Sequence, residues 1–438
     1  MPEMKDSGIE WIGEMPADWL LQPIRYLITD HFSGSWGEDA KGNENDRICM
    51  RIADFDFSKM QFKILPDEEY TVRNYSNSDI YKKTLRHGDI LIEKSGGGDK
   101  TPVGRTVVYR LSYPAIFANF MDCIRVNSSK IEVEFVKYVF YSLYKRGVTN
   151  LYFNQTTGLQ NLNMQKYFRE VCIPTPEIKV QKNIAKYLDL RCTEIDALIA
   201  DIQSEIEILE EYKKSVITEV VTKGLNPKVQ MKDSGIKWIG MSPEHWKTNK
   251  IKYHLRRNEL RNPGGVQVLS VYREYGVIPK DSRDDNHNVT SEDTSKYKYV
   301  KPGVLVINKM KAWQGSMGVS EYEGIVSPAY FIYEFTDDLV VGKYLHYLLR
   351  NVYKDEFRRI SGGIREGQWD LPATGFENEY ITIPPVEEQQ SIVTYLDETL
   401  AYIEETIAMK QEQLVILEEY KKSVIYEYVT GKKEVPLS

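Results

Sequence analysis

The sequence predicts a mixed α/β protein of the α+β class, in which two globular domains are separated by two long antiparallel coiled-coil helices. Two internal repeats support this prediction. The decapeptide Ile208–Ile217 returns unchanged as Ile416–Ile425, inside stretches whose apolar residues follow a heptad spacing. A second repeat opens each half of the chain. The whole molecule is therefore expected to have an internal pseudo-twofold repeat.

Two helices of about 46 residues are predicted near 177–222 and 385–430, because neither stretch contains an internal proline or glycine. Pro176 and Pro385 precede them, and Gly224 and Gly431 follow them. The first heptad seam is Leu188, Cys192, Ile195, Ile199, Ile202, Ile206, Leu209, Val216 and Val220. The second is Leu396, Leu400, Ile403, Ile407, Leu414, Leu417 and Val424, with Lys410 interrupting it. At ~1.5 Å per residue each helix is ~70 Å long.

The two heptad helices are expected to pair with each other. A lone heptad helix usually mediates dimerisation, but two matched copies in one chain allow an intramolecular pair. A block of globular size follows Gly224 before the second helix begins. The second helix is therefore expected to return alongside the first in the antiparallel direction. An intermolecular coiled coil stays open as the alternative.

The second repeat frames the two globular blocks. Met4–Trp19 and Met231–Trp246 match at eleven of sixteen positions. The offset between copies is 227 residues here and 208 at the helices, so the first block is 19 residues longer. Between the repeated ends, residues 20–171 and 247–380 share little sequence. A duplicated frame with two unlike inserts indicates that the two inserts recognise two different targets.

These landmarks divide the chain into four parts. They are a first globular domain at 1–175, a first helix at 176–223, a second globular domain at 224–384, and a second helix with a tail at 385–438. Both inserts combine strands and helices. Strands are predicted at 88–94, 104–109 and 302–309, and helices at 133–144 and 341–358.

Composition restricts the class of protein. No segment approaches the ~18 to 20 consecutive apolar residues that span a bilayer, and the N-terminal residues lack the apolar core of a signal peptide. The four cysteines are Cys49, Cys123, Cys172 and Cys192. Their spacing supports neither a disulfide framework nor a zinc site. A cytoplasmic protein without membrane contact is expected.

The net charge of −7 is unevenly distributed. Residues 177–222 hold ten acidic and six basic side chains, and residues 385–430 hold ten acidic and three basic ones, so the helices carry −4 and −7. The rest of the chain carries +4. Acid on the helices can thus conceal basic, DNA-facing surfaces on the globular domains. The alternative is that the acidic residues are only the solvated face of a coiled coil.

Four glycine-rich turns carry basic and amide side chains, at 93–105, 156–161, 308–316 and 361–368. Glycine lets the backbone approach a surface closely, and Lys, Arg and Gln donate to phosphates and base edges. The candidate DNA-binding residues are Lys94, Ser95, Lys100, Arg105, Gln160, Lys309, Lys311, Gln314, Arg365 and Gln368. Such turns are also ordinary hairpin connections, so a structural role is the alternative for each.

The chain shows no catalytic constellation. The spacing of a P-loop is absent, as is the Asn/Asp-Pro-Pro-Tyr motif of adenine methyltransferases, and the six histidines are scattered without ligand spacing. The protein is therefore expected not to be an enzyme and to hold no metal or cofactor of its own. Two other classes stay open: a structural coiled-coil adaptor that joins two protein-binding domains, and an enzyme without a recognisable motif.

Five stretches carry a family resemblance: residues 8–19 and their copy from Gly235, Ile383-Pro-Pro-Val-Glu-Glu-Gln-Gln-Ser-Ile392, 303–315 and 324–330. With them the chain resembles, over essentially its whole length, the specificity subunit of type I restriction–modification systems. The first copy departs slightly, because Ile173-Pro-Thr-Pro-Glu-Ile-Lys-Val-Gln181 replaces the Pro-Pro-x-Glu-Glu-Gln pattern.

The resemblance implies that the globular domains are two target recognition domains, each reading one half of a split, asymmetric site in double-stranded DNA. It also implies that the helices set the spacing between the half-sites. Two methyltransferase subunits would dock on the helices, flip an adenine and transfer a methyl group from S-adenosylmethionine. Two motor-nuclease subunits would join them to cut unmodified DNA.

The expected docking residues lie in the repeated decapeptide. They are Glu210, Lys213 and Lys214, with their copies Glu418, Lys421 and Lys422. A two-helix seam alone does not require identity at these charged positions. Two equivalent surfaces imply two copies of one partner. The alternative is a recent duplication that has not yet diverged.

Overall fold

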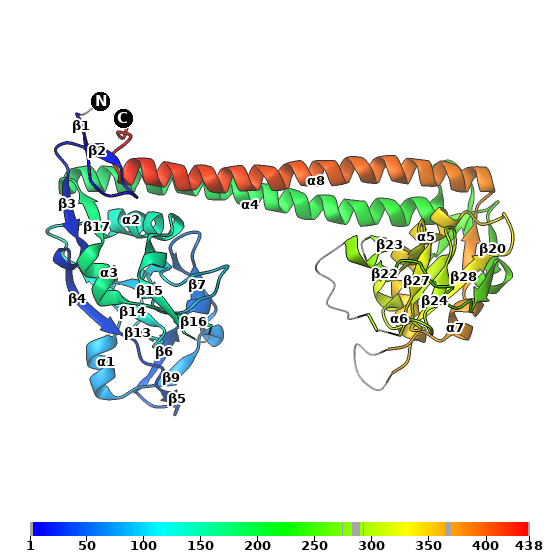
Figure 1. The fold of residues 1–438 in the computed structure, drawn as a ribbon, viewed down its shortest axis with the longest axis horizontal. Helices are drawn as coiled ribbons and strands as arrows, with labels where there is room; N and C mark the ends of the chain where they lie inside the picture. Colours follow the sequence, from blue (N-terminus) through cyan, green and yellow to red (C-terminus); the bar gives the residue numbers. More distant parts are fainter. Residues whose placement is uncertain are drawn as a thin grey trace. The chain divides into compact units, whose positions relative to one another are not determined.

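A computed structural model describes residues 3–156, 158–273, 275–282, 290–291, 293–363 and 369–436. The chain forms two compact units (Figure 1). Unit 1 contains residues 1–203 and 411–438, and unit 2 contains residues 204–410. Each unit therefore holds one globular part and one segment of each long helix. The boundaries expected from the sequence had instead treated each helix as a part separate from the globular domains.

The two long helices have the predicted limits. Helix α4 spans Ile178–Lys223 and helix α8 spans Val386–Val429. The glycines that follow them have positive φ angles, 76° at Gly224 and 72° at Gly431. Glycine adopts this left-handed conformation without strain, so it ends a helix at little cost. Across the described residues, the longest helices are too polar to form a membrane span.

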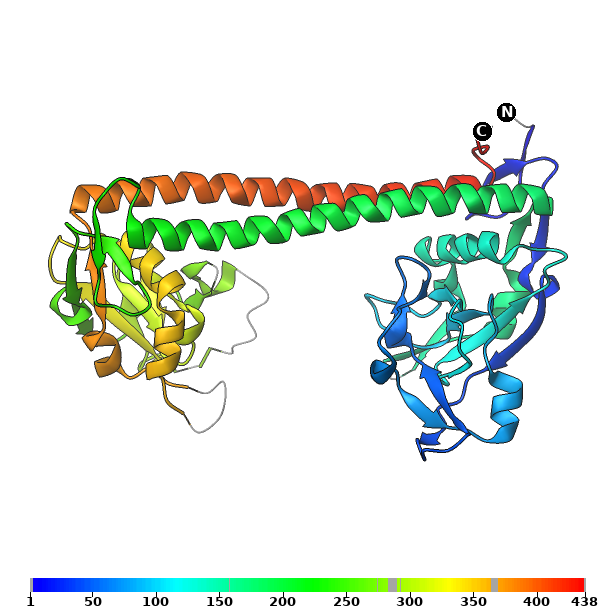
Figure 2. The same cartoon turned by 180° about the vertical axis from the view of Figure 1, so that it is seen from behind.

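Within each unit the segments of α4 and α8 pack side by side in opposite directions (Figures 1 and 2). The paired positions are Tyr187 with Tyr428 and Asp196 with Lys421 in unit 1, and Glu205 with Lys410 and Lys213 with Glu404 in unit 2. Residue numbers rise along α4 as they fall along α8. The predicted antiparallel intramolecular pair is confirmed.

The predicted heptad positions lie along the contact between the helices. The buried ones are Leu188, Cys192, Ile195, Val216 and Val220 of α4 and Leu396, Leu400, Ile403, Ile407 and Val424 of α8. The remaining predicted seam residues are partly buried. Lys410, which interrupts the pattern, pairs with Glu205 of α4. The polar interruption is thus matched by an acid across the seam.

Two ion pairs of this contact occupy equivalent positions in the repeat but differ in burial. In unit 1, Lys421 is 4% exposed and its Nζ donates to Asp196 Oδ1 at 2.6 Å and to the Ser58 carbonyl at 2.8 Å. In unit 2, Lys213 Nζ lies 2.8 Å from Glu404, and both side chains are more accessible to water. Removing one partner of a buried ion pair lowers the stability of the fold more than removing one partner of an exposed ion pair.

Lys421→Met is therefore expected to destabilise unit 1 by on the order of 3 kcal/mol, because it leaves the carboxylate of Asp196 unpaired. Lys213→Met should cost less than about 1 kcal/mol. Hydrogen exchange of the α4 and α8 amides at increasing urea concentration measures both values. Equal losses in the two variants would contradict the difference in burial.

Unit 1 is built on a six-stranded sheet with strand order β4-β14-β10-β12-β8-β7. The strands are β4 (Ile28–Ser33), β14 (Met121–Val126), β10 (Ile90–Glu93), β12 (Thr106–Val108), β8 (Gln61–Phe62) and β7 (Phe55–Asp56). Ile90 and Ile92 share a core with helix α2 (Val133–Lys145), whereas Leu91 belongs to the core on the other face. Successive side chains point to opposite faces of a strand, so both faces of this sheet are buried.

Two further sheets complete the first insert. The sheet β13-β6-β9-β5 consists of Ala115–Phe117, Asp46–Met50, Val72–Asn74 and Glu38–Asp39. The sheet β11-β16-β15 consists of Ser95–Gly96, Leu159–Leu162 and Phe153–Thr156. Helices α1 (Asn77–Lys83) and α3 (Met164–Glu170) flank them. Strand β3 (Leu20–Pro23) pairs with β17 (Cys172–Thr175), which joins the two ends of the insert.

Unit 2 has a four-stranded sheet of order β21-β28-β25-β26, which matches the first four strands, β4-β14-β10-β12, of the six-stranded sheet in unit 1. The strands of the unit 2 sheet are Leu255–Asn258, Tyr330–Phe335, Leu305–Asn308 and Met317–Val319. Smaller pairs are β22 (Leu269–Tyr272) with β23 (Gly276–Pro279), β24 (Lys298–Val300) with β27 (Gly324–Val326), and β20 (Lys247–Lys250) with β29 (Tyr380–Ile383). The two inserts thus share a strand order that their sequences do not reveal.

The helix predicted at 341–358 is wrong as a single element. The structure has α5 (Gly342–Val352) and α6 (Lys354–Ile360), separated at Tyr353, and a further short helix α7 (Ala373–Asn378). Tyr353 is fully buried, and its hydroxyl donates to the Tyr380 carbonyl at 2.5 Å. Its backbone angles, φ −96° and ψ 5°, leave the helical region. Burial of this ring therefore accompanies a change of direction in the chain.

One glutamine in each long helix anchors the insert of its own unit. Gln181 Oε1 accepts from the N–H of Glu132, the residue before α2, at 2.8 Å. Gln389 Oε1 accepts from the N–H of Val341, the residue before α5, at 2.8 Å. Each amide nitrogen donates to backbone carbonyls nearby. The repeat therefore preserves the contact that attaches each insert to the coiled coil.

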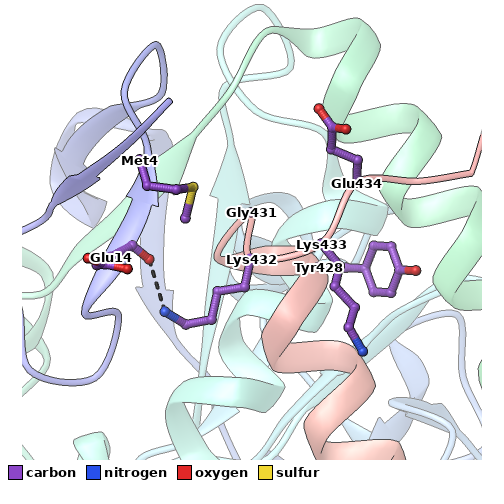
Figure 3. A pocket seen from close by; sticks show the side chains of 7 residues that line it. All are labelled: Met4, Glu14, Tyr428, Gly431, Lys432, Lys433 and Glu434. Carbon is purple, nitrogen blue, oxygen red and sulfur yellow. Dashed lines mark hydrogen bonds between the residues drawn. The ribbon is translucent and has the colours of Figure 1, made fainter. Parts of the chain in front are cut away.

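A small hairpin precedes each insert. The hairpins are β1 (Met4–Asp6) with β2 (Glu14–Pro16) and β18 (Met231–Asp233) with β19 (Met241–Pro243). In unit 1 the first hairpin meets the end of α8, where Lys432 Nζ donates to the Glu14 carbonyl at 2.9 Å (Figure 3). A crevice of about 480 Å³ lies there, lined by acidic, basic and apolar residues alike. These contacts hold the frame of the unit together.

Candidate nucleic-acid interface

Two of the basic residues predicted in the first insert are held by buried acids. Lys94 follows β10, and its Nζ lies 2.6 Å from Asp122 Oδ1 on the neighbouring strand β14. Arg105 Nε donates to Glu93 Oε2 at 2.7 Å, and its Nη2 donates to Oε1 at 3.1 Å. Both cations remain partly accessible, with about a fifth of each side chain exposed. They can therefore present positive charge from fixed positions.

The carboxyl group of Asp122 is held in its charged form by its hydrogen-bond partners. Burial alone would raise its pKa, but hydrogen bonds from His31 and Lys94 outweigh burial, and the pKa is lowered overall. The carboxylate is thus charged at neutral pH. Its contribution to stability is lost only as the pH falls through the lowered value. For Arg105, the hydrogen bond with Glu93 raises the guanidinium pKa further.

The sheet β11-β16-β15 presents a polar row on its exposed face. Ser95 is opposite Asn161 in the strand register, and Asn161 is opposite Asn154. Residues directly opposite each other project from the same face of a sheet. Asn154 and Asn161 are exposed, and Ser95 Oγ donates to Asn161 Oδ1 at 2.6 Å. Sequence reasoning had named Ser95 but not the two asparagines.

Gln160 requires a correction. It was predicted to contact DNA, but it points to the opposite face from Asn161 and is 2% exposed. Its Oε1 accepts from the Val103 N–H at 3.1 Å. A side chain added at Gly97 would meet the same oxygen at 2.8 Å. Gln160 therefore fixes the turn at 97–103 beneath the sheet and has no path to a base edge in this conformation.

The turn at 97–103 also carries Lys100, which is exposed. Its predicted contact with phosphate stays a prediction. Gly97 has a φ of 62°, a conformation that a residue with a Cβ rarely adopts. The backbone N–H of Gly98 donates to the Thr101 carbonyl at 3.0 Å, which closes the turn. Lys100 thus projects from a tight turn that Gln160 holds against the sheet.

In unit 2 the corresponding turn follows β25. Lys309 Nζ lies 2.8 Å from Asp370 Oδ2, so this lysine is paired like Lys94 of unit 1. Lys311 is exposed. A cavity of about 330 Å³ lies beside it, with polar lining that includes Lys280, Asn308 and Tyr330. Basic and hydroxyl groups therefore gather at this turn as well.

Of the three other candidate DNA-binding residues in the second insert, one is described by the structure and two are not. Gln314 lies in a short turn of helix after Lys311, and its Oε1 is buried without a hydrogen-bond partner among the described residues. Arg365 and Gln368 lie outside the described residues. The assignment of DNA contact to Lys309, Lys311, Gln314, Arg365 and Gln368 stays a prediction.

The predicted docking residues also need a correction. Lys421 is buried against Asp196 and Ser58, so it cannot form part of an open docking surface. Its copy Lys213 is engaged with Glu404. Of the other predicted docking residues, Glu210, Lys214 and Glu418 are exposed, and Lys422 is partly buried and paired with Glu419. The repeated decapeptide also exposes large apolar residues that sequence reasoning had not singled out.

These apolar residues are matched between the copies. Ile208 and Tyr212 are 61% and 51% exposed in unit 2, and Ile416 and Tyr420 are 59% and 48% exposed in unit 1. A spacing of four places each pair on one face of its helix. Their positions in the heptad lie outside the seam. Exposed apolar pairs repeated at equivalent places are typical of interaction surfaces.

Among the described residues, no group of three or more His, Cys, Asp or Glu side chains could hold a metal ion. The four cysteines are free, and three of them are buried. The turns of the two units expose amides, hydroxyls and cations alongside single acids such as Asp99. Amides, hydroxyls and cations are the groups that contact phosphates and base edges in DNA.

Comparison with known proteins gives the same picture. The type I restriction modification DNA specificity domain matches residues 69–208 and 247–415. The MjaVIII type I restriction enzyme specificity subunit of Methanocaldococcus jannaschii is 26% identical, over 68% of this chain and 70% of its own. The EcoKI type I restriction enzyme specificity subunit of Escherichia coli K12 is 20% identical, over 96% and 90%.

The fold agrees as well. One solved structure concerns complex assembly and conformational transition of the type I R-M system. A chain of that structure superposes on this protein with a TM-score of 0.64 and is 13% identical to it in sequence. The superposition covers 96% of this chain and 99% of that one. The matched domain and the relatives confirm the role of a DNA sequence-specificity subunit, and the structural adaptor is not favoured. The two matched copies of the domain together cover more than half of the residues of this chain. The chain therefore belongs to the type I restriction modification DNA specificity family.

Proposed function

We propose that each unit reads one half of a bipartite, asymmetric duplex site, and that this chain performs no catalysis itself. The observation that carries the proposal is the common strand order of the two inserts combined with their different exposed turns. The shared sheet gives both units the same framework. Among the described residues, the row of Ser95, Asn161 and Asn154 in unit 1 has no matching row after β25 of unit 2, where Lys309 and Lys311 lie.

The basic residues suit the positioning part of DNA recognition. Lys94, Lys100 and Arg105 in unit 1 and Lys309 and Lys311 in unit 2 are partly or fully exposed. Cations bind phosphates irrespective of sequence, and base edges then supply the specificity. The pairing of Lys94 and Arg105 with buried acids restricts their motion. Less side-chain entropy is therefore lost when such groups meet DNA.

Partner subunits supply the chemistry in this proposal. Two methyltransferase subunits dock on the coiled coil, one at each copy of the repeated decapeptide, and use S-adenosylmethionine. Restriction subunits join that complex to cut DNA that lacks the modification. The matched exposure of Ile208 with Tyr212 and of Ile416 with Tyr420 supports two equivalent docking sites.

The test exchanges one insert. Residues 20–171 are replaced with the corresponding insert of another family member, and the sites methylated in a host that carries the partner genes are mapped by methylome sequencing. Gln181 and Asp189 are retained, but their partners Glu132 and Tyr138 belong to the exchanged segment. The incoming insert is therefore chosen to carry a tyrosine at the position of Tyr138, so that the unit should still assemble. We expect one half of the methylated site to change and the other half to stay as it was.

The reciprocal exchange of residues 247–380 is the matched control, and it should change only the other half. Methylated sites in which both halves change after a single exchange would contradict independent reading. Unchanged sites after both exchanges would contradict DNA reading by the inserts altogether.

A further inference from the structure

The exposed face of the sheet β11-β16-β15 has the chemistry of a base-reading surface. Asn154 and Asn161 are adjacent across the β15–β16 hairpin and both are exposed. Leu159 lies two residues before Asn161 on the same strand face and is 54% exposed. On the opposite face Gln160 and Leu162 of β16 are buried, whereas Gln155 of β15, opposite Gln160, is exposed.

The geometry suits the major groove of duplex DNA. That groove admits a two-stranded β-ribbon. β15 and β16 form a hairpin with four residues on each strand, and β11 joins it only at Gln160 and Asn161. Opposite residues on a ribbon have Cβ atoms about 5 Å apart, whereas neighbouring base pairs are ~3.4 Å apart, so the two side chains must converge slightly to meet adjacent pairs. Asn154 and Asn161 can therefore reach the edges of neighbouring base pairs.

The amides are selective for one base. The side chain of asparagine donates to N7 and accepts from N6 of adenine in a bidentate contact. Ser95 Oγ donates to Asn161 Oδ1 at 2.6 Å, which holds the amide in one orientation. The carbonyl oxygen of the amide has two lone pairs, so it can still accept from adenine N6. An exposed leucine beside the amides suits the methyl group of thymine.

We propose that the β15–β16 hairpin enters the major groove and that Asn161 and Asn154 read adenines of adjacent A·T pairs in the half-site of unit 1. The proposal rests on the function proposed above and adds the reading element, its residues and the class of base. Gln160 acts as a positioning residue, because it holds the turn that carries Lys100 against the far face of the hairpin. Lys100 contacts phosphate beside the hairpin.

The experiment selects duplexes from a library with 30 random base pairs, using the full-length chain in complex with its methyltransferase partner. Wild-type protein should enrich a motif with two halves separated by an unread gap. Asn161→Ala should remove the preference for A·T at one position of one half. The loss of discrimination there should be about 5- to 150-fold, the range for one bidentate contact. Asn154→Ala should do the same at the adjacent position.

Two controls separate base reading from general binding. Asn77 is an exposed amide on α1 of the same unit, and Asn77→Ala should leave the motif unchanged. Lys100→Ala should weaken binding to all sequences, reduce the salt dependence and preserve the motif. Circular dichroism on each variant confirms that the exposed substitutions leave the fold intact.

The outcomes distinguish this inference from the function on which it rests. If the wild-type complex enriches no bipartite motif, the proposed function fails and the inference fails with it. If the wild type enriches such a motif but Asn161→Ala and Asn154→Ala enrich the same one, only the inference is overturned. A relaxed position that is a G·C pair in the wild-type motif would also overturn the assignment to adenine.

Discussion

Replacing Ile208 and Tyr212 with aspartate should remove one of the two methyltransferase copies from the assembled complex. Both residues are about half exposed or more, and they project from one face of α4 outside the seam. A docking surface of this kind owes its affinity to a few apolar anchors surrounded by polar side chains. Two buried carboxylates at its centre would lack partners, so docking there should be abolished.

The same change at Ile416 and Tyr420 of α8 should remove the other copy, and the fourfold variant should bind none. Native mass spectrometry of the purified complex counts the subunits directly. Leu198→Asp is the matched control, because Leu198 is an exposed apolar residue of α4 that lies outside the repeated decapeptide. A fourfold variant that still carries two methyltransferases would show that the repeated face is not the docking surface.

The elements that the sequence predicted best are those whose signal is local and long. Helices α4 and α8 combine an uninterrupted heptad with proline before and glycine after, so their limits and antiparallel pairing followed from the pattern. The strand β10 was equally clear, because both faces of its sheet are buried and it reads as one apolar run.

The candidate site was predicted less well because it depends on strand register. Residues 156–161 had been interpreted as a turn, although Leu159–Leu162 is a strand. On a strand, a shift of one residue moves a side chain to the other face, which is why Gln160 was named and Asn161 was missed. Phe153–Thr156 and Leu159–Leu162 flank Gly158, and this short spacing was the available signal for a hairpin.

Identity of sequence did not ensure identity of environment. Lys213 and Lys421 occupy the same place in an identical decapeptide, but only Lys421 donates to the carbonyl of Ser58. That carbonyl belongs to the first insert, whose sequence has no counterpart in the second. Tertiary contacts of this kind cannot be read from the helix alone. For the same reason, the common strand order of the inserts was hidden by their divergent sequences.

Lengthening the coiled coil by one heptad should change the length of the unread gap and preserve the bases that are read. The pairs Asp196 with Lys421 and Glu205 with Lys410 identify the positions where the insertions must be made. Seven residues are added to α4 between 196 and 205, and seven to α8 between 410 and 421. Because both helices grow together and the heptad is kept, the seam stays in register on both sides of the insertions.

One heptad adds ~10.5 Å to an α-helix, which is the length of about three base pairs and the upper limit of the change in the gap. Methylome sequencing of the variant should show both original half-sites at a new spacing. Insertion into α4 alone is the control, since it displaces Asp196 from Lys421 and should abolish methylation instead of altering the gap. A doubly lengthened variant that still methylates only the original spacing would contradict the measuring role of the helices. Such a result would mean that the spacing is set by the methyltransferase subunits or by the DNA itself, because every contact between α4 and α8 would have been preserved.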